Sequence, residues 1–270
     1  MPTFDITASA DCLEQLTAIG IAAATAILKS RGDGEIHIKA DGSPVTRADL
    51  AAEAVIRDGL SRAAATIPIV SEEQAESEQP NPSARYFLVD PLDGTREFIA
   101  GRDEYTVNIG LVSDGAPILG MIVAPALGLI WRGIVGRGAE RLEFWSGKAS
   151  RPQAIHTRPR PDGELAVMVS RSHLNAPTQA YLDGLPHTRR IACGSSVKFC
   201  RLAEGAADHY PRLGPTRDWD VAAGHAVLVA AGGSVLTPDG TPLRYGMPDR
   251  RIPGFLAWGG PAASVGTVKG

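Results

Sequence analysis

The chain has 270 residues, a formal net charge of −3 and 44% hydrophobic residues. A chain of this length and composition can bury a large core, which excludes disordered and collagen-like proteins. The acidic balance argues against binding to a nucleic-acid polymer, because such binding depends mainly on lysine and arginine contacts with phosphates.

The first half of the chain opens with two segments that have helix-compatible, Ala-rich patterns, residues 8–29 and 46–65. Thr46 and Asp49 are typical start signals for the second helix. The Gly-rich stretch between the two helices is predicted to be a loop or a hairpin. Asp49 by itself is an ordinary acidic residue of a first helical turn.

A short apolar strand, residues 67–70, is followed by Ser71, Glu72 and Glu73, so carboxylates lie at a strand end. The run of residues 72–81 is rich in Glu, Ser and Gln, and we expect a mobile solvated loop over the site.

The hexapeptide DPLDGT at residues 90–95 directly follows the apolar run of residues 86–89 and is the most informative feature of the chain. Pro91 has no N–H to donate, so it is predicted to end the strand and to leave Asp90 and Asp93 on a tight turn. Two carboxylates and a main-chain carbonyl suit a hard cation such as Mg²⁺.

The end of this hexapeptide adds two further features. Gly94 allows the backbone to bend and to approach a ligand closely. Thr95 can cap a following helix and can offer its hydroxyl. For the segment alone, an Asx turn followed by a helix cap is the alternative interpretation.

Three predicted strands linked by short turns, residues 106–112, 118–123 and 129–135, form a β-meander. The second half alternates strands and helices. Its predicted strands are residues 165–170, 189–193 and 234–236. One predicted helix begins after Ala176, and two more cover residues 195–205 and 218–231. This order predicts an α+β fold with a mostly antiparallel first sheet and a mixed second sheet.

Trp219 and Asp220 precede the apolar part of the last helix, where an acidic residue is favourable as a cap in its own right. Asp218 adds another carboxylate, and the sequence leaves open whether it affects a metal site or faces solvent.

Three blocks, residues 71–73 (SEE), 90–95 (DPLDGT) and 219–220 (WD), resemble the metal-binding signature of the inositol monophosphatase superfamily of lithium-sensitive phosphatases. Within it the chain looks like the CysQ group of 3'(2'),5'-bisphosphate nucleotidases. This second likeness is carried by residues 41–46, 90–98, 104–109, 170–173, 194–200 and 214–216. The resemblance spans about residues 10–258 and implies a layered αβαβα sandwich of the inositol monophosphatase and fructose-1,6-bisphosphatase type.

The resemblance implies a set of metal ligands. Glu72, Asp90 and the main-chain carbonyl of Leu92 would hold one Mg²⁺, and Asp90, Asp93 and Asp220 would hold another. Glu73 would lie behind them or bind a weak third ion, giving two or three Mg²⁺ per site. The charge argument agrees, because an acidic cluster repels a phosphate monoester unless bound cations supply positive charge.

The resemblance also implies the groups that act on the substrate. Asp49 and Thr95 match the pair that orients and deprotonates the attacking water. The positions that contact substrate match Gly94, Thr95, His173, Ser195, Lys198 and Arg212. From the local sequence alone, Ser195 could equally be a helix cap and Lys198 a solvated lysine, whereas a helix N-terminus here would favour an anion.

The Pro-rich stretch of residues 151–161 is the expected joint between an N-terminal α+β half with the metal site, residues 1–150, and a C-terminal α/β half with the specificity elements, residues 151–270. We expect a single structural unit over residues 1–270, because the implied metal ligands come from both halves.

The resulting hypothesis is an Mg²⁺-dependent hydrolase that converts adenosine 3',5'-bisphosphate to AMP and phosphate, in sulfur assimilation or nucleotide salvage, with 3'-phosphoadenylyl sulfate as a further substrate. One alternative is a phosphatase for inositol-1-phosphate or another sugar phosphate. Another is a sensor that binds phosphorylated ligands without turnover. A homodimer is left open.

Cys12, Cys193 and Cys200 form no CxxC motif, and their odd number indicates a reducing compartment. The longest apolar stretch, residues 19–28, is too short and too Ala-rich for a bilayer span. We therefore expect a cytoplasmic protein without a transmembrane segment. Members of the CysQ group can be peripheral to the inner membrane, but no basic amphipathic helix here explains such binding.

Overall fold

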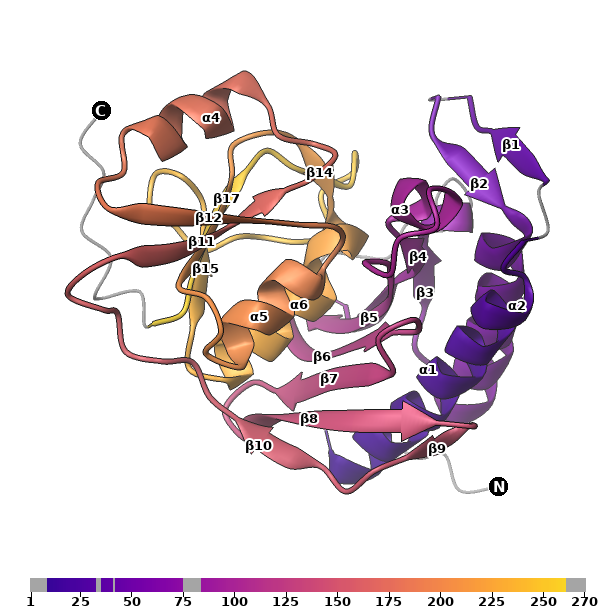
Figure 1. Cartoon of the computed structure of the whole chain (residues 1–270). Helices are drawn as coiled ribbons and strands as arrows, with labels where there is room; N and C mark the ends of the chain where they lie inside the picture. Colours follow the sequence, from indigo (N-terminus) through magenta and orange to yellow (C-terminus); the bar gives the residue numbers. More distant parts are fainter. Residues whose placement is uncertain (1–8, 33–34, 41, 75–83, 261–270) are drawn as a thin grey trace.

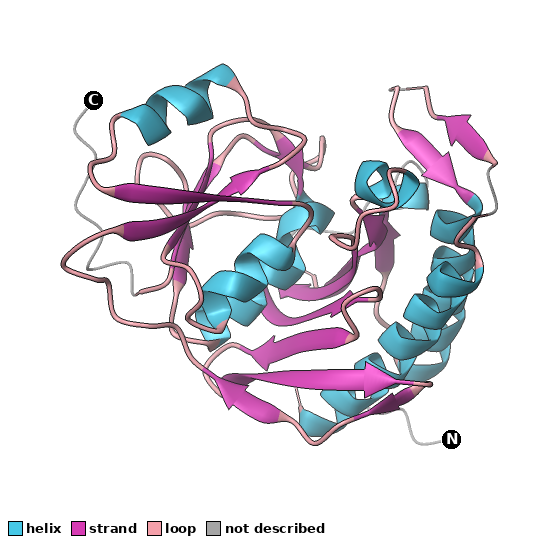
Figure 2. Cartoon of the chain, in the orientation of Figure 1, coloured by secondary structure: helices cyan, strands magenta, loops and turns pink. Residues whose placement is uncertain are grey.

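The structure is a computed structural model that describes residues 9–32, 35–40, 42–74 and 84–260. Its helices and strands stack in five alternating layers, which confirms the expected αβαβα sandwich (Figures 1 and 2). Two helices cover the outer face of the first sheet, two lie between the sheets, and one covers the second sheet. In that order they are α1 (Ala10–Lys29), α2 (Arg47–Ala63), α5 (Val197–Ala203), α6 (Asp218–Ala230) and α4 (Ala176–Asp183).

The first sheet has eight strands in the order β10-β8-β7-β6-β5-β4-β3, with β9 paired to β8. Every pair is antiparallel except β3 with β4, as expected for this sheet. The strands are β3 (Ile69–Ser71), β4 (Tyr86–Asp93), β5 (Thr106–Ser113), β6 (Ala116–Ala124), β7 (Leu129–Ile134), β8 (Gly138–Trp145), β9 (Lys148–Ala149) and β10 (Gln153–Ile155). The sequence predicted the β5–β7 meander but not its continuation through β8 to β10.

The second sheet is mixed, as predicted, with the order β12-β11-β13-β17-β15. Its strands are β11 (Leu165–Ser170), β12 (Thr188–Cys193), β13 (His209–Arg212), β15 (Ser234–Leu236) and β17 (Phe255–Trp258). Two small sheets complete the fold: the hairpin of β1 (Ile36–Ile38) and β2 (Pro44–Thr46), and the pair of β14 (Thr216–Arg217) and β16 (Arg251–Ile252). The hairpin fulfils one of the two expectations for the Gly-rich stretch and carries the exposed side chains of Ile36 and Ile38.

Strand β4 does not end at Pro91, which corrects the prediction of a tight turn there. Its pairing with β5 continues from Asp90 opposite Asn108 to Asp93 opposite Thr106, with a register shift between them. Three steps along β4 thus match two along β5, which is a β-bulge, and a bulge tolerates a residue without an N–H. The bulge bends the strand at its carboxyl end, between the two aspartates, and both of them line the cavity described below.

A row of three glycines places α6 close to the first sheet. Gly110, Gly120 and Gly133 are direct partners on β5, β6 and β7. A Cβ atom on Gly120 would lie 2.2 Å from the carbonyl oxygen of Ala223 on α6, so only glycine allows this approach. The close packing determines where the first turn of α6, which carries Asp220, meets the end of β4.

Helix α1 is the one helix among the described residues that is long and apolar enough to cross a membrane, with a mean hydropathy of 1.3 in its most apolar window. Half of that window is buried inside the fold, where Leu16, Ile21 and Ile27 join the core between the helices and the first sheet. A buried core helix passes the same test of length and composition, so the observation is weak evidence for a span.

Candidate functional site

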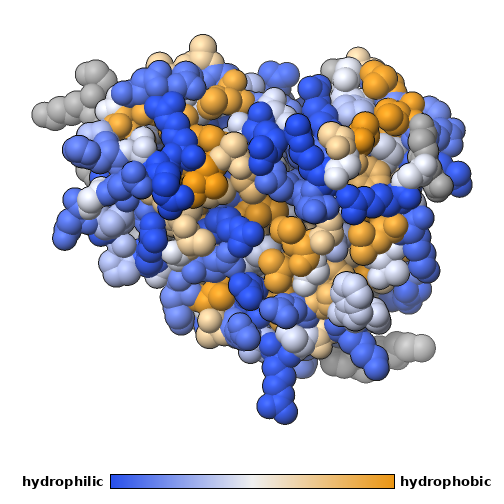
Figure 3. All heavy atoms as spheres, viewed as in Figure 1, coloured by the Kyte–Doolittle hydropathy of each residue, from blue (hydrophilic) through white to orange (hydrophobic). Residues whose placement is uncertain are grey.

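A cavity of about 1060 Å³ opens between the first sheet, the β1–β2 hairpin and the second sheet. Its walls come from both halves of the sequence, and the face of the molecule seen in Figure 3 carries hydrophilic and hydrophobic side chains side by side. All residues predicted to bind metal or substrate line this cavity: Glu72, Glu73, Asp90, Leu92, Asp93, Gly94, Thr95, His173, Ser195, Lys198, Arg212 and Asp220. Asp49, buried on α2, reaches it through Thr95.

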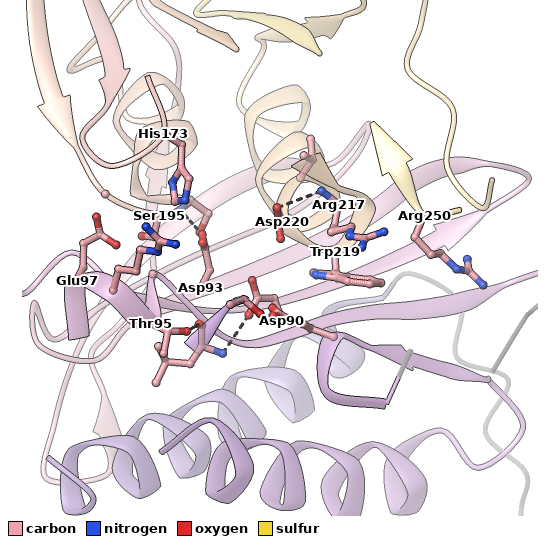
Figure 4. A pocket seen from close by; sticks show the side chains of 18 of the residues that line it. Asp90, Asp93, Thr95, Glu97, His173, Ser195, Arg217, Trp219, Asp220 and Arg250 are labelled. Atoms are coloured by element: carbon pink, nitrogen blue, oxygen red, sulfur yellow. Dashed lines mark hydrogen bonds between the residues drawn. The ribbon is translucent and has the colours of Figure 1, made fainter. Parts of the chain in front are cut away.

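Three carboxylates from different elements converge on the floor of the cavity. Glu72 begins the 3-10 helix Glu72–Gln74 after β3, Asp90 lies on β4, and Asp220 lies in the first turn of α6. One oxygen of each lies within 4.8 Å of the other two. Asp93 lies beside Asp90 and Asp220 in the middle of the site (Figure 4). The arrangement brings together carboxylates that the sequence separates by up to 148 residues, from Glu72 to Asp220 (220 minus 72).

Each aspartate in the cluster has one oxygen fixed by a main-chain N–H. Asp90 Oδ1 accepts from Leu92 N at 3.1 Å, Asp93 Oδ2 from Ser196 N at 2.6 Å, and Asp220 Oδ2 from Arg217 N at 3.1 Å. Within the described residues, the second oxygen of each accepts no hydrogen bond. Oriented carboxylates with one oxygen left over fit a hard divalent cation, which binds to oxygen ligands.

The charges in the cluster oppose one another. Burial and then the neighbouring carboxylates, Glu72 first, raise the pKa of Asp90 well above its usual range. Burial and then Asp220 raise the pKa of Asp93 to about 6. Burial raises the pKa of Glu72 to about 7, although Lys39 acts in the opposite direction. Ionised carboxylates at these positions need a compensating cation.

Lys39 is a site residue that the sequence analysis missed. It follows β1, and its Nζ donates to Glu72 Oε1 at 2.9 Å and to Glu73 Oε1 at 2.7 Å. Glu72 and Glu73 therefore share the ammonium group of Lys39. The signal that could have found Lys39 is its place two residues before the stretch of residues 41–46. Asp41 lies outside the described residues, and so do residues 75–81 of the expected mobile loop.

Asp49 serves as both a helix cap and a partner of the site. Its Oδ2 accepts from Thr46 N at 2.8 Å and from Thr46 Oγ1 at 2.6 Å, which completes the capping box of α2. Its Oδ1 lies 3.1 Å from Thr95 Oγ1, the predicted partner. Burial raises the pKa of Asp49, and the hydrogen bonds from Thr46 and Thr95 lower it in part.

Thr95 does not cap the following helix, α3 (Thr95–Ile99), because Gly94 is its N-cap residue and makes no side-chain cap. The Thr95 hydroxyl instead lies 3.1 Å from Asp49 Oδ1 and 3.2 Å from Leu92 O, the carbonyl predicted to bind metal. Gly94 has φ +93°, and a Cβ atom there would lie 3.1 Å from Glu104 O. Glycine is therefore required where β4 turns into α3.

A polar network fixes Asp93 from the second half of the chain. Besides its main-chain contact, Ser196 contacts Asn108 Oδ1 at 2.6 Å and Thr106 Oγ1 at 2.7 Å through its hydroxyl. Helix α5 begins at Val197, later than predicted, and Ser195 is not its cap. The N–H of Ser196, directly before this short helix, therefore contacts Asp93.

The residues predicted to contact substrate lie on the opposite wall. Lys198 is buried, not solvated, and its ammonium donates to Cys193 O at 3.3 Å and to Ser195 O. Arg212 ends strand β13. His173 and Ser195 lie together beside Asp93 (Figure 4). Desolvation and the charges of Arg212 and Arg96 lower the pKa of His173, so the ring is neutral near pH 7.

The structure also shows where the Asp218 side chain lies, which the sequence left open. It is buried and faces Arg250, whose Nη1 lies 3.7 Å from Asp218 Oδ2. Burial raises the pKa of Asp218 to about 7. Its carboxylate does not face solvent, and it is not a member of the Glu72, Asp90 and Asp220 group.

A divalent cation should stabilise the protein more at pH 8 than at pH 5.5. In the folded chain the pKa values of Glu72 and Asp93 are about 7 and about 6, whereas unfolded carboxyls titrate near about 4. Between about pH 4 and about pH 7 the folded state therefore binds more protons than the unfolded state. The protonated carboxyls contribute to the stability of the metal-free protein, and that contribution is lost as the pH rises through their folded-state pKa values. The measurement is the melting temperature at each pH, first with about 5 to 10 mM Mg²⁺ and then with a chelator; the difference between the two values is the stabilisation by the cation.

The comparison uses the shift caused by the cation, because buried histidines titrate in the opposite direction. Burial lowers the pKa of His209 to about 3 and that of His225 to about 4, so their contribution is lost as pH falls below about 6.5. An equal cation-induced shift at the two pH values would contradict the electrostatic account of the cluster.

The chain is similar to known proteins over most of its length. The inositol monophosphatase family matches residues 11–262 of the chain. The 3'(2'),5'-bisphosphate nucleotidase CysQ of Shigella flexneri is 45% identical over 213 residues, which cover 78% of this chain and 83% of that protein. The crystal structure of CysQ from Bacteroides thetaiotaomicron matches with a TM-score of 0.77 and 32% identity, covering 91% and 97% of the two chains. An inositol monophosphatase from Anabaena matches with a TM-score of 0.74 and 25% identity, covering 94% and 92%.

Proposed function

Because this chain belongs to the inositol monophosphatase family, we propose that it is a metal-dependent phosphatase that hydrolyses adenosine 3',5'-bisphosphate to AMP and phosphate. The observation that carries the proposal is one cavity with an oriented acidic cluster on its floor and cationic side chains on its wall. Similarity to CysQ nucleotidases over most of the chain supports the nucleotide substrate. The proposal includes 3'-phosphoadenylyl sulfate as a second substrate of the same site.

We assign the metal to two or three Mg²⁺ ions held by Glu72, Asp90, the Leu92 carbonyl, Asp93 and Asp220, with Glu73 in support. When bound, such ions neutralise phosphate oxygens and lower the pKa of water, so that hydrolysis can proceed near neutral pH. The buried carboxylates repel one another, so a nearby cation is needed to lower the free energy of ionising them. They therefore fit the role of metal ligands.

Thr95 and Asp49 are the groups that handle the proton of the attacking water. Thr95 Oγ1 can accept a hydrogen bond from that water while it donates its own proton towards Asp49 Oδ1, 3.1 Å away. Asp49 is suited to be the final acceptor because burial raises the pKa of its carboxyl. The capping box with Thr46 holds the carboxylate in this orientation before substrate binds.

The opposite wall would hold the nucleotide. Gly94 lets the main chain approach the reacting phosphate, and His173, neutral near pH 7, can stack on or hydrogen-bond to the base. Ser195 and Arg212 border the same space. Lys198 acts through its charge and by fixing the carbonyls of residues 193 and 195, because its ammonium is already hydrogen-bonded to them.

The proposed location is the cytoplasm. Cys12, Cys193 and Cys200 are all buried and unpaired, as expected in a reducing compartment. Binding to the inner membrane and a homodimer have no specific support among the described residues and are not proposed.

The test is phosphate release by the purified protein with Mg²⁺ on adenosine 3',5'-bisphosphate, inositol-1-phosphate and AMP. We expect kcat/KM to be highest for the bisphosphate by about 10-fold or more, because a second phosphate adds a charge-assisted contact that AMP, with one phosphate, cannot make while it reacts. A preference for inositol-1-phosphate would retain the metal chemistry and refute the nucleotide. No release from any substrate would favour the non-catalytic sensor.

A further inference from the structure

Arg96 is a cationic pocket residue for which the proposed mechanism has no role. It follows Thr95 on α3, and its side chain is exposed to the cavity. Five other cationic side chains line the same cavity, and each contacts a protein oxygen: Lys39, Lys198, Arg212, Arg217 and Arg250. Among residues 9–32, 35–40, 42–74 and 84–260, the Arg96 guanidinium has no hydrogen bond or ion pair.

Two contacts fix the loop that faces Arg96. The hydroxyl of Ser172 donates to Glu97 Oε1, which ties the loop after β11 to α3. Arg171 binds Glu104 through two hydrogen bonds of 2.9 and 2.8 Å, and Gly194 N donates to the same carboxylate at 2.9 Å. These contacts join the two halves of the chain on either side of the pocket and hold His173 near Arg96 without using the Arg96 side chain.

Arg96 lies near enough to His173 for its charge to act on that ring, and both residues line the cavity. Arg96 is among the main charges that lower the pKa of His173, together with Arg212. The charges that act on Asp90 are those of other carboxylates, and those that act on Asp93 include Lys198 and Arg212. Arg96, His173 and Arg212 thus line the same cavity, and both arginines act on the histidine.

We propose that Arg96 binds the phosphate of the substrate that is not cleaved, and that it thereby sets the preference for a bisphosphate over a monophosphate. The inference rests on the proposed function and names a specificity-determining residue for it. A guanidinium presents a planar fork of donors that matches phosphate oxygens. Since no protein contact of Arg96 must be broken, its whole donor set is available to the ligand.

The test compares wild type and Arg96→Gln on two substrates with the same reacting phosphate, adenosine 3',5'-bisphosphate and adenosine 3'-monophosphate. We expect kcat/KM to fall about 10- to 100-fold for the bisphosphate, mainly through KM, and by no more than about 3-fold for the monophosphate. The inhibition constant of AMP, which keeps only the uncleaved phosphate, should rise in parallel. Arg96→Lys should recover part of the loss, because it restores the charge but not the fork.

The matched control is Arg102→Gln, which removes the same charge from an exposed arginine just beyond α3 that does not line the cavity. It should leave the ratio of the two kcat/KM values unchanged. The inference would be overturned if Arg96→Gln lost activity equally on both substrates or lost activity on neither. The proposed function would still stand in that case, provided that the wild-type protein preferred the bisphosphate. If wild type itself hydrolysed no nucleotide, the proposed function and this inference would fall together.

Discussion

Replacing Asp90 with asparagine is expected to abolish most phosphate release while raising the melting temperature of the metal-free protein. Asp90 is buried at the centre of the cluster, and the charges of Glu72, Asp93, Asp220 and Asp49 all act against its ionisation. Asparagine keeps an oxygen that can accept from Leu92 N but lacks the charge that holds a cation. Loss of several kcal/mol of charge stabilisation corresponds to a decrease in kcat/KM on the order of 1000-fold or more.

The opposite signs of the two effects separate this result from simple misfolding. Steady-state kinetics with Mg²⁺ measure the first effect, and thermal unfolding in a chelator at pH 8 measures the second. For proteins near this size, 1 kcal/mol changes the melting temperature by about 2 to 4 °C. The control is Asp183→Asn on α4, which removes the same charge from an exposed pair with Arg190. An active Asp90→Asn enzyme would refute the metal assignment, and a lower melting temperature would refute the repulsion argument.

The second large effect is expected for Thr95→Ala, which removes the hydroxyl between the attacking water and Asp49. We expect kcat to fall by about 10² to 10⁴, the usual contribution of general acid–base catalysis. The metal ligands remain in place, so slow metal-dependent turnover should persist. The increase in melting temperature caused by Mg²⁺ should equal that of wild type, because the Thr95 side chain is not proposed as a ligand.

Thr95→Ser is the matched variant for this prediction, since it keeps the hydroxyl that lies 3.1 Å from Asp49 Oδ1. It should retain kcat within about 10-fold of wild type, the difference reflecting the extra rotational freedom of serine. If Thr95→Ala kept kcat within a few fold of wild type, the water would be activated without this pair, and Asp49 would be only the cap of α2.

The acidic residues illustrate why local patterns admitted two interpretations. Asp49 and Asp220 were each expected either to cap a helix or to take part in chemistry. The structure shows that each does the former with one oxygen, through Thr46 N for Asp49 and Arg217 N for Asp220, and turns towards the site with the other. A carboxylate has two oxygens, so the two interpretations did not exclude each other.

The errors in the sequence analysis share a physical origin. Pro91 was expected to end its strand, but pairing with β5 continues around it through a bulge. Lys39 and Arg96 were missed because a single lysine or arginine beside a motif has no periodicity or spacing to mark it. Their importance appears only from what faces them, Glu72 and Glu73 for Lys39 and an open pocket for Arg96.

The sequence by itself determined the local features of this protein: the long helices, the β5–β7 meander, the carboxylates at two strand ends, the capping residues of α2, and a close likeness to one phosphatase family. These depend on side chains and main-chain groups a few residues apart. Only the tertiary structure decided which carboxylates meet, because Glu72, Asp90 and Asp220 belong to three elements. Their convergence depends on a glycine row that lets α6 approach the sheet, and such packing acts between residues that are distant in the chain.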